Sequence, residues 1–221
     1  METLLPNVDW LEIWQASLDT LNMLGGSMLF TVLFGLPLGV LLFLTGPRQM
    51  FEQKGLYAAI SLVVNVLRSV PFVILLILLI PVTVVITGTS LGVAGAIPPL
   101  VVGATPFFAR LVETALREVD RGIIEATQAM GASTRQIIFN ALLPEALPGI
   151  LAAITVTAIT LVSYTAMSGL IGGGGLGDLA VRYGYQRYQP DVMFVTVALL
   201  VVLVQILQTI GDRLVVHFSR K

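Results

Sequence analysis

Four long stretches of this sequence carry no charged residue, and they limit the folds that the chain can adopt. They span residues 20–47, 69–109, 146–177 and 192–211. An ionised side chain at the centre of a bilayer costs about 3 kcal/mol or more, so charged residues mark the ends of membrane-spanning segments. A helix of about 20 apolar residues crosses a hydrocarbon core of ~30 Å. Each stretch is therefore long enough to span a membrane.

The composition agrees with this interpretation. Charged residues make up 11% of the chain and hydrophobic residues 56%, and the mean hydropathy is +0.93. Soluble domains carry about 25% charged residues, so this chain has too few of them to cover a surface that faces water. The same composition excludes intrinsic disorder. The sequence predicts an integral membrane protein of the all-α class.

The number of spans follows from the longest charge-free stretch. Residues 69–109 are about twice as long as one span requires, and Arg68 alone separates them from an apolar run that begins at Leu56. We therefore expect two helices here, with a short turn between them that is rich in residues typical of turns: Pro81, Thr83, Thr87, Gly88 and Thr89. The five expected spans are roughly 21–44, 56–80, 90–110, 150–170 and 192–211.

The positions of lysine and arginine predict the orientation, because cytoplasmic loops are enriched in both. Arg68 aside, an external N-terminus and an internal C-terminus place most basic residues in the cytoplasm and leave only Arg182 and Arg187 outside. The cytoplasmic ones are Arg48, Lys54, Arg110, Arg117, Arg121, Arg135, Arg213, Arg220 and Lys221. The segment before Asp19 has acidic residues and no basic ones, so we expect no cleaved signal peptide.

Several kinds of chemistry are disfavoured by what the sequence lacks. There are no cysteines and only one histidine, His217, so a clustered metal site is not expected. None of the acidic residues falls within a predicted span, which argues against a proton or sodium relay. No phosphate-binding P-loop pattern occurs, and a net charge of −1 offers no basic field for nucleic acid. The chain is expected to be no enzyme and to bind no cofactor, so uphill transport would need energy from another subunit.

Arg68 is the one charge that could enter a span. It lies in N-V-L-R-S-V-P-F, before Pro71, which is expected to kink the helix and free a backbone carbonyl. One interpretation, which we favour, is an arginine near the inner end of the span whose side chain reaches the interface. The other is an arginine packed inside the assembly.

The segment 120–148 lies on the cytoplasmic side and predicts a helix that ends at a glycine. Gly131 suits the position just after a helix, where a left-handed backbone conformation costs glycine little. Apolar positions recur at the helical spacing i, i+3, i+4 and i+7, in Ile123, Ala126, Thr127 and Met130.

A second short helix follows. Ser133 and Gln136 fit a capping box at its start. Pro144 is expected to end it, and Pro148 can occupy the first turn of the next span. The segment is too small to bury its own apolar faces, so either it packs on the ends of its own spans or it docks on a partner.

These residues resemble a known family. Glu125-Ala126, Gly131 and Leu143-Pro144 match the E-A-A-x3-G-x9-I-x-L-P signature of ABC importer permeases, except that Thr127 replaces an alanine and Ala141 an isoleucine. The resemblance implies one permease domain over residues 1–221, in which 120–148 form the loop that docks into a groove of an ATPase. The implied coupling residues are Glu125, Ala126, Gly131, Ala132, Leu143 and Pro144.

Shorter motifs are similar to those of the methionine importer permeases. They are R-S-V-P-F at 68–72, G-A-T-P-F-F-A-R at 103–110, L-L-P-E-A-L-P-G at 142–149, S-Y-T-A-M-S-G at 163–169 and G-G-G-L-G at 173–177. The resemblance implies a homodimer in a bacterial inner membrane, two cytoplasmic ATPases that bind ATP and Mg²⁺, and an external solute-binding lipoprotein. The alternatives are a permease for another small amino acid or related organic solute, and a passive channel or structural membrane subunit.

The candidate pathway residues lie in the fourth span. Ser163, Tyr164 and Met167 offer hydroxyl groups and a flexible apolar side chain within a span rich in small residues. They are either the lining of a polar cavity with Met167 as its gate, or tight helix packing and core filling.

Two external segments follow the fourth span. We expect Gly172–Gly175 to form a tight turn, because no lysine or strand accompanies these glycines as a phosphate-binding loop would require. The segment 178–191 either docks the binding protein or lies at the membrane interface. Its aromatic and basic residues are Arg182, Tyr183, Tyr185, Arg187 and Tyr188.

Overall fold

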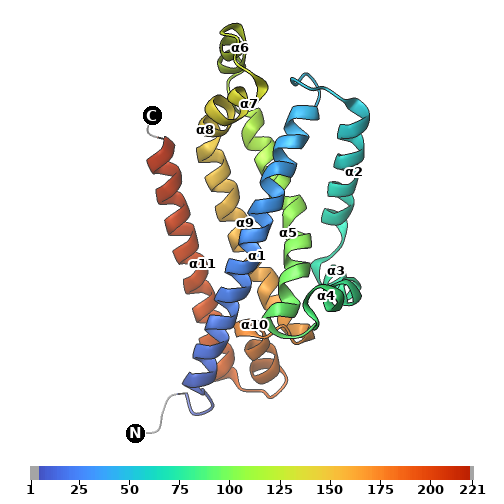
Figure 1. Ribbon diagram of the computed structural model, residues 1–221. Helices are drawn as coiled ribbons and strands as arrows, with labels where there is room; N and C mark the ends of the chain where they lie inside the picture. Colours follow the sequence, from blue (N-terminus) through green and yellow to red (C-terminus); the bar gives the residue numbers. More distant parts are fainter. Residues whose placement is uncertain (1–4, 220–221) are drawn as a thin grey trace.

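The computed structural model describes residues 5–219, and every regular element in this part of the chain is a helix (Figure 1). Four helices are long and apolar enough to cross a membrane: α1 (Trp10–Thr45), α5 (Gly92–Arg117), α9 (Leu147–Ser168, continued by a 3₁₀ turn to Ile171) and α11 (Pro190–Ser219). Between α1 and α5, α2 (Lys54–Ser69) and α3 (Phe72–Leu78) form a pair bent by 103°. The prediction of an all-α membrane protein is confirmed, and the pair supplies the fifth span in broken form.

The break in the second span lies at Val70 and Pro71. Val70 adopts an extended conformation with φ −79° and ψ 125°, as residues before proline commonly do because the proline ring disfavours the helical region. Pro71 has no N–H to continue the helix. The sequence predicted a kink here, and the structure shows that the helix stops and changes direction. The expected single helix over 56–80, kinked at Pro71, is therefore wrong, because the chain forms two separate helices.

The expected turn over residues 81–89 is also wrong. Ile80–Thr87 form the helix α4, with Pro81 in its first turn, where a missing N–H leaves no hydrogen bond unmade. Gly88 ends α4 in a left-handed conformation with φ 77°, and its N–H donates to the carbonyl of Val84. Proline and glycine thus delimit a short helix.

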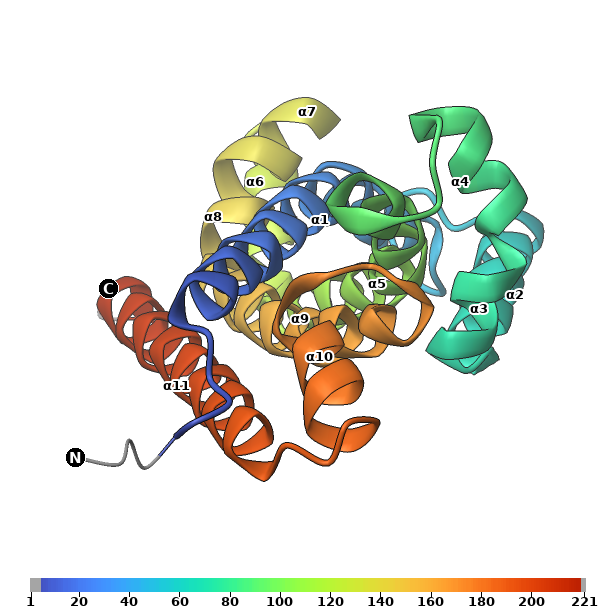
Figure 2. The same ribbon diagram turned by 90° about the horizontal axis from the view of Figure 1, so that it is seen from below.

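Helix α5 lies at the centre of the bundle, between α1 and α9, as the view in Figure 2 shows. Two glycines of α1 allow its close contact with α5. A Cβ atom added at Gly35 would lie 2.7 Å from Cδ1 of Phe108, and one added at Gly39 would lie 2.6 Å from Cβ of Val112. This is the small-residue packing through which membrane helices approach one another. The segment α2–α4 and helix α11 lie on opposite sides of this centre (Figure 2).

The helices extend beyond the predicted spans at most ends. Helix α1 begins at Trp10, where the carboxylate of Asp9 accepts hydrogen bonds from the N–H groups of Leu11 and Glu12. Helix α5 continues to Arg117 and α11 to Ser219. Charge therefore marked where apolar sequence ends rather than where the helix ends.

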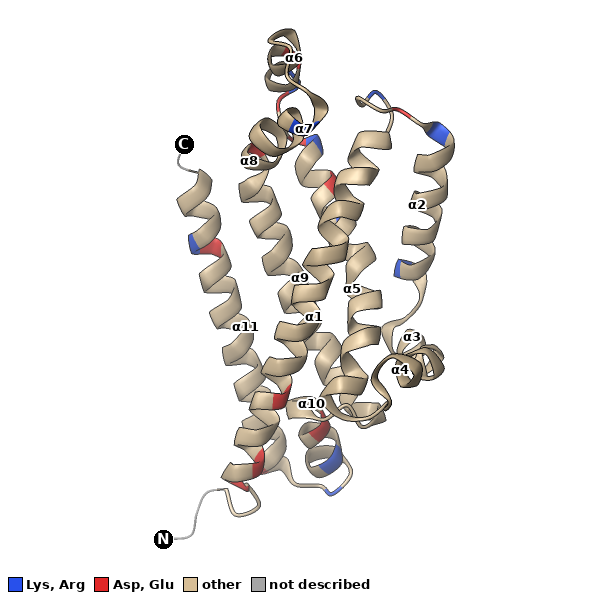
Figure 3. Cartoon of the chain, in the orientation of Figure 1, with Lys and Arg blue, Asp and Glu red and all other residues tan. Residues whose placement is uncertain are grey.

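Short helices close the two ends of the bundle. At one end lie α6 (Arg121–Ala129), α7 (Thr134–Gln136), a π-helical turn (Ile137–Leu142) and α8 (Leu143–Glu145). At the other lie α10 (Gly175–Leu179) and a second π-helical turn (Ala180–Tyr185). Charged residues gather near these two ends and on α2, and the middle of the bundle carries few (Figure 3). Which end faces the cytoplasm stays a prediction from the positions of lysine and arginine.

Candidate functional site

The first half of the segment 120–148 folds as the sequence predicts. Asp120 caps α6 by accepting a hydrogen bond from the N–H of Gly122 at 2.8 Å. Beyond the end of α6, Gly131 has φ 78°, and its N–H donates to the carbonyl of Gln128 at 2.9 Å. Residues with a side chain rarely adopt this left-handed conformation, so the position favours glycine.

The second half confirms the capping box and corrects the role of Pro144. The N–H of Ser133 donates to Oε1 of Gln136 at 2.8 Å, and the N–H of Gln136 donates to Oγ of Ser133 at 3.4 Å. The helix does not end at Pro144. The chain passes through the π-helical turn into α8, where Pro144 lies in the first turn. Pro148 lies in the first turn of α9, as predicted.

One side of this segment packs on the bundle. Ile124, Ile137 and Leu142 are buried in the same apolar cluster as Phe108 and Leu116 of α5. This cluster holds the segment against the ends of the spans. Of the two interpretations left open by the sequence, packing on the chain's own spans therefore describes one side of the segment.

The other side is exposed. Met130 is 79% exposed and Phe139 59%, so both present apolar surface on this side. Beside Met130 lies an open hollow of about 460 Å³, lined by Thr127, Met130, Gly131, Ala132, Gln136, Asn140 and Ala141. Among the candidate coupling residues, Glu125, Ala126, Gly131 and Pro144 are exposed, and Ala132 and Leu143 are half-buried. The structure thus places most of them on the uncovered side, and their coupling role stays a prediction.

Most hydroxyl groups of α9 take part in packing within the helix. Those of Thr157, Thr165 and Ser168 are buried and donate to carbonyls one turn earlier. Ser163 and Met167 differ, because both are exposed and lie one helical turn apart. The exposed face of α9 therefore carries two of the three candidate pathway residues.

Tyr164, the third candidate, is half-buried and stacks on Phe72. The two ring centroids are 4.1 Å apart and the ring planes differ by 3°. Phe72 is the first residue of α3, so the stack attaches the broken span to α9. No sequence pattern indicated this contact, because residues so far apart in the chain meet only in the folded molecule.

Glu113 lies just past the expected span 90–110, and the sequence analysis did not single it out. This residue lies inside α5 and is 3% exposed. Its carboxylate pairs with Arg110 at 2.6 Å and with Arg117 at 2.7 Å, and it accepts a hydrogen bond from the hydroxyl of Tyr57 at 3.1 Å. The spacing of Arg110, Glu113 and Arg117 at i, i+3 and i+7 was a signal for this cluster. The cluster ties α2 to α5 and offers no free carboxylate for an ion relay.

The glycines that follow α9 form a tight turn, as predicted. Gly172, Gly174 and Gly175 all have positive φ. The N–H of Leu176 donates to the hydroxyl of Thr20 at 2.9 Å, which fixes the turn against α1. In the next segment, Arg182 pairs with Asp178 at 2.9 Å and with Glu12 at 3.4 Å. Tyr185 and Tyr188 are exposed.

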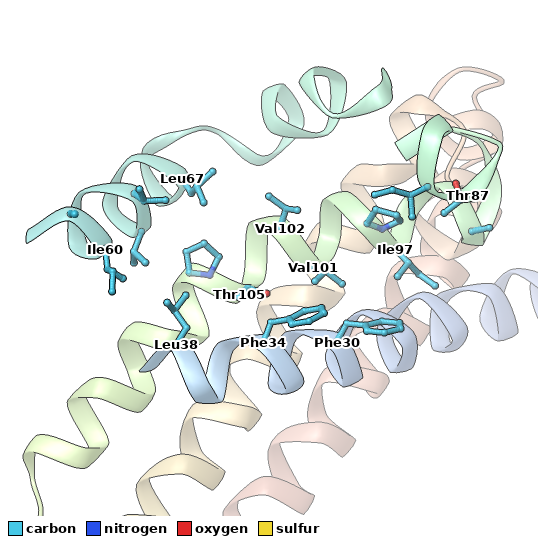
Figure 4. Close-up of a pocket in the computed structure, with 17 residues that line it drawn as sticks. Phe30, Phe34, Leu38, Ile60, Leu67, Thr87, Ile97, Val101, Val102 and Thr105 are labelled. Atoms are coloured by element: carbon cyan, nitrogen blue, oxygen red, sulfur yellow. The ribbon is translucent and has the colours of Figure 1, made fainter. Parts of the chain in front are cut away.

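A large apolar groove of about 1100 Å³ lies between α1, α2, α4 and α5 (Figure 4). Phe30 and Phe34 line one side, and Ile97 and Val101 lie across from them. The residues that line it include no charged or amide side chain, and its only hydroxyl side chains are Thr87 and Thr105. A polar solute would find few hydrogen-bonding partners there, so this groove is not the candidate pathway.

Residues 35–221 match the family model of the binding-protein-dependent transport system inner membrane component. The chain belongs to this family. It is therefore a multi-pass membrane component of a transport system and not itself an enzyme.

Several permeases of this family are similar to the chain over most of its length. The probable D-methionine transport system permease protein MetI of Vibrio cholerae is 56% identical over 181 residues, covering 82% of this chain and 80% of that protein. The methionine import system permease protein MetP of Bacillus subtilis is 50% identical over 211 residues, covering 96% and 95%. Among solved structures, a chain of the inward-facing MetNI methionine ABC transporter matches with a TM-score of 0.93 and 48% identity, covering 96% of this chain and 100% of that one.

Proposed function

We propose that this chain is the transmembrane permease subunit of an ATP-driven methionine importer. One observation carries the proposal: the chain matches a chain of the MetNI methionine ABC transporter along almost its whole length, at 48% identity and a TM-score of 0.93. The names of MetI and MetP, which cover 82% and 96% of the chain, agree on methionine as the solute.

The proposed complex contains two copies of the chain, two cytoplasmic ATPases that bind ATP and Mg²⁺, and an external solute-binding lipoprotein, in a bacterial inner membrane. The exposed side of the segment 120–148 supports an ATPase partner. Met130 and Phe139 are exposed apolar side chains on this side, and the buried side holds the segment on the ends of the spans. A partner that covers these side chains removes apolar surface from water, which is favourable.

This arrangement explains how ATP hydrolysis in another subunit can move the membrane spans of this chain. The segment is attached to α5 through Ile124, Ile137 and Leu142, so a displacement of the ATPase moves the end of α5 and the start of α9. The cavity between two copies can then open alternately to either side. ATP shifts this equilibrium only by as much as it favours one conformation over the other.

The test starts from the complex. The tagged chain is co-expressed with the ATPase of its transport system, purified, and assayed for bound ATPase and for ATP hydrolysis. We expect a stable complex in the wild type and about tenfold less bound ATPase in Met130→Asp, because the substitution places a charge in an apolar contact. The matched control is Gln128→Asp, an exposed change in the last turn of α6, two residues before Met130, that should retain the ATPase.

Reconstitution with the binding protein then identifies the solute. We expect uptake of labelled methionine that unlabelled methionine suppresses. A stable ATPase complex without methionine uptake would retain the importer and point to another small amino acid or related organic solute. A chain that binds no ATPase would contradict the proposal and favour a passive membrane subunit.

A further inference from the structure

Arg68 lies near the end of α2, three residues before Pro71, and it is exposed in the single chain. Helix α2 rises about 1.5 Å per residue, so Arg68 lies roughly 21 Å along the helix from Lys54. This length is roughly two thirds of a hydrocarbon core of ~30 Å. The interpretation of Arg68 as a residue near the inner end of its span stays a prediction, because the structure contains no membrane. A charged residue inside a membrane span is expected to have a function.

Arg68 lines a small cavity together with the aromatic residues that join α3, α5 and α9. The cavity has a volume of about 130 Å³, and it is lined by Leu67, Arg68, Val70, Phe72, Leu75, Gly103, Phe107 and Tyr164. The guanidinium carbon of Arg68 lies 5.9 Å from the ring centre of Phe107. Tyr164, stacked on Phe72, contributes the only hydroxyl side chain to this lining. Cavities for drug-sized ligands measure ~300–1,000 Å³, so this one suits a smaller molecule or part of one.

The polar groups of this cavity are free to bind a ligand. Within residues 5–219, neither the guanidinium of Arg68 nor the hydroxyl of Tyr164 has a hydrogen-bond or ion-pair partner. The arginines of the buried cluster in α5, Arg110 and Arg117, are by contrast both paired with Glu113. A guanidinium presents a planar fork of N–H donors that matches a carboxylate in geometry and charge.

The break in the helix supplies an acceptor beside this donor. Pro71 has no N–H, so it cannot donate to the carbonyl of Leu67 four residues earlier. Leu67 lines the same cavity. A carbonyl that lacks its helical donor can accept a hydrogen bond from an ammonium group. Transporters use discontinuous helices for substrate sites in this way, because unwound backbone carbonyls are available there.

We propose that this cavity binds a zwitterionic amino acid on its way through the membrane, with its carboxylate on Arg68 and Tyr164 and its ammonium group on the carbonyl of Leu67. The rings of Phe72 and Phe107 contact the side chain of the amino acid, and a thioether packs well against aromatic rings. The inference rests on the proposed function for its choice of methionine. The cavity lies beside the face of α9 that carries Ser163 and Met167, where the sequence predicts the pathway.

The test uses the assembled transporter, with binding protein and ATPase, in proteoliposomes. Arg68→Gln removes the charge and retains a polar side chain of moderate length. We expect methionine uptake to fall about tenfold or more, because the carboxylate loses its charged partner. Arg68→Lys, which retains the charge without the planar fork, should transport at an intermediate rate. Tyr164→Phe retains the ring stack and should lower uptake a few-fold.

The control is Lys54→Gln, which removes a positive charge at the exposed end of the same helix, where Lys54 is 87% exposed. This variant should transport at the wild-type rate. Complex yield and ATP hydrolysis without binding protein should match the wild type in all four variants, which separates ligand binding from folding.

A direct readout accompanies the rates. A photoreactive methionine analogue with a diazirine in its side chain is irradiated during turnover, and the labelled peptides are identified by mass spectrometry. We expect label on peptides that contain Phe72, Phe107 or Tyr164, suppressed by excess methionine and lost in Arg68→Gln.

The outcomes separate the two claims. If the wild type and Arg68→Gln take up methionine at the same rate, the cavity is not the binding site. Label that avoids these peptides leads to the same conclusion. In both cases the proposed importer function stands. A loss of dimer in Arg68→Gln would also overturn the cavity as the binding site, because the partner of Arg68 would then be an acidic side chain of the second copy. If the wild type transports no methionine, the proposed function itself fails, and methionine as occupant fails with it.

Discussion

Phe72 and Tyr164 stack with their ring centroids 4.1 Å apart and their planes within 3° of parallel. This contact joins the first residue of α3 to the C-terminal part of α9. It therefore fixes the position of the chain just after the break at Pro71, where no helical hydrogen bond connects α2 to α3. The stack supports both the broken span and the small cavity beside it.

Tyr164→Ala should destabilise the protein, whereas Tyr164→Phe should not. Aromatic pairs contribute about 0.5–1.5 kcal/mol beyond their buried area, so we expect a loss of roughly 2 kcal/mol in Tyr164→Ala and almost none in Tyr164→Phe. Thermal unfolding in detergent, followed by intrinsic fluorescence, measures both. Equal midpoints for the two variants would show that the stack does not hold α3.

Removing the carboxylate of Glu113 should be costly. Glu113→Gln leaves Arg110 and Arg117 without their ionic partner in a buried position. Breaking a fully buried pair in this way costs about 3–5 kcal/mol. Because Arg117 is 37% exposed, we expect a loss of roughly 2–3 kcal/mol, measured by thermal unfolding.

The control for this change is Glu118→Gln on the same helix end, where the carboxylate is exposed. Surface substitutions of this kind change stability by no more than ~0.5 kcal/mol. If both variants unfold at the same temperature, the Glu113 cluster does not stabilise the contact between α2 and α5.

The contact between α1 and α5 depends on the absence of a side chain at Gly39. A Cβ atom there would lie 2.6 Å from Val112 and 2.7 Å from the carbonyl oxygen of Ala109. Gly39→Leu should destabilise the protein by about 3 kcal/mol or more through overpacking, and less of it should reach the membrane. On the same helix, a Cβ at Gly25 would meet no atom within 4 Å, so Gly25→Leu should be tolerated. Similar yields of folded protein for both variants would contradict this packing.

Gly131→Glu should uncouple transport from ATP hydrolysis. The substitution forces a side chain into the left-handed conformation at φ 78° and onto the exposed side of the segment 120–148. We expect the methionine carried per ATP hydrolysed to fall about tenfold, which corresponds to ~1.4 kcal/mol of coupling free energy. Uptake and phosphate release, measured in parallel at equal membrane abundance, give this ratio.

Gly88 provides the matched control, because it has φ 77° and a Cβ there would also meet no atom within 4 Å. Gly88→Glu carries the same backbone strain at the other end of the bundle and should leave the ratio unchanged. Normal transport by Gly131→Glu would show that the segment 120–148 does not couple ATP hydrolysis to transport.

The sequence predicted the features that local physics determines. The five spans followed from the cost of placing charges in hydrocarbon. The turn at Gly131 and the capping box of Ser133 and Gln136 followed from backbone hydrogen bonding within a few residues. In each case the residues that decide the structure are neighbours in the chain.

The features that the sequence analysis missed depend on distant contacts or on signals with two meanings. Pro81 and Gly88 are typical of a turn, yet they also suit the start and end of a helix, which is α4. Pro71 predicted a kink, but the change of direction also depends on the stack of Phe72 on Tyr164. Pro144 did not end its helix, because the π-helical turn before it places it in the first turn of α8.

Accumulation of methionine against its gradient tests the central claim most directly. The chain, its ATPase and its binding protein are reconstituted in proteoliposomes with ATP or ADP on the side of the ATPase, and labelled methionine is followed over time. The account predicts that methionine on that side rises above the concentration supplied on the other only with ATP. Equilibration to the same concentration on both sides with either nucleotide would contradict it, because the chain would then act as a passive channel.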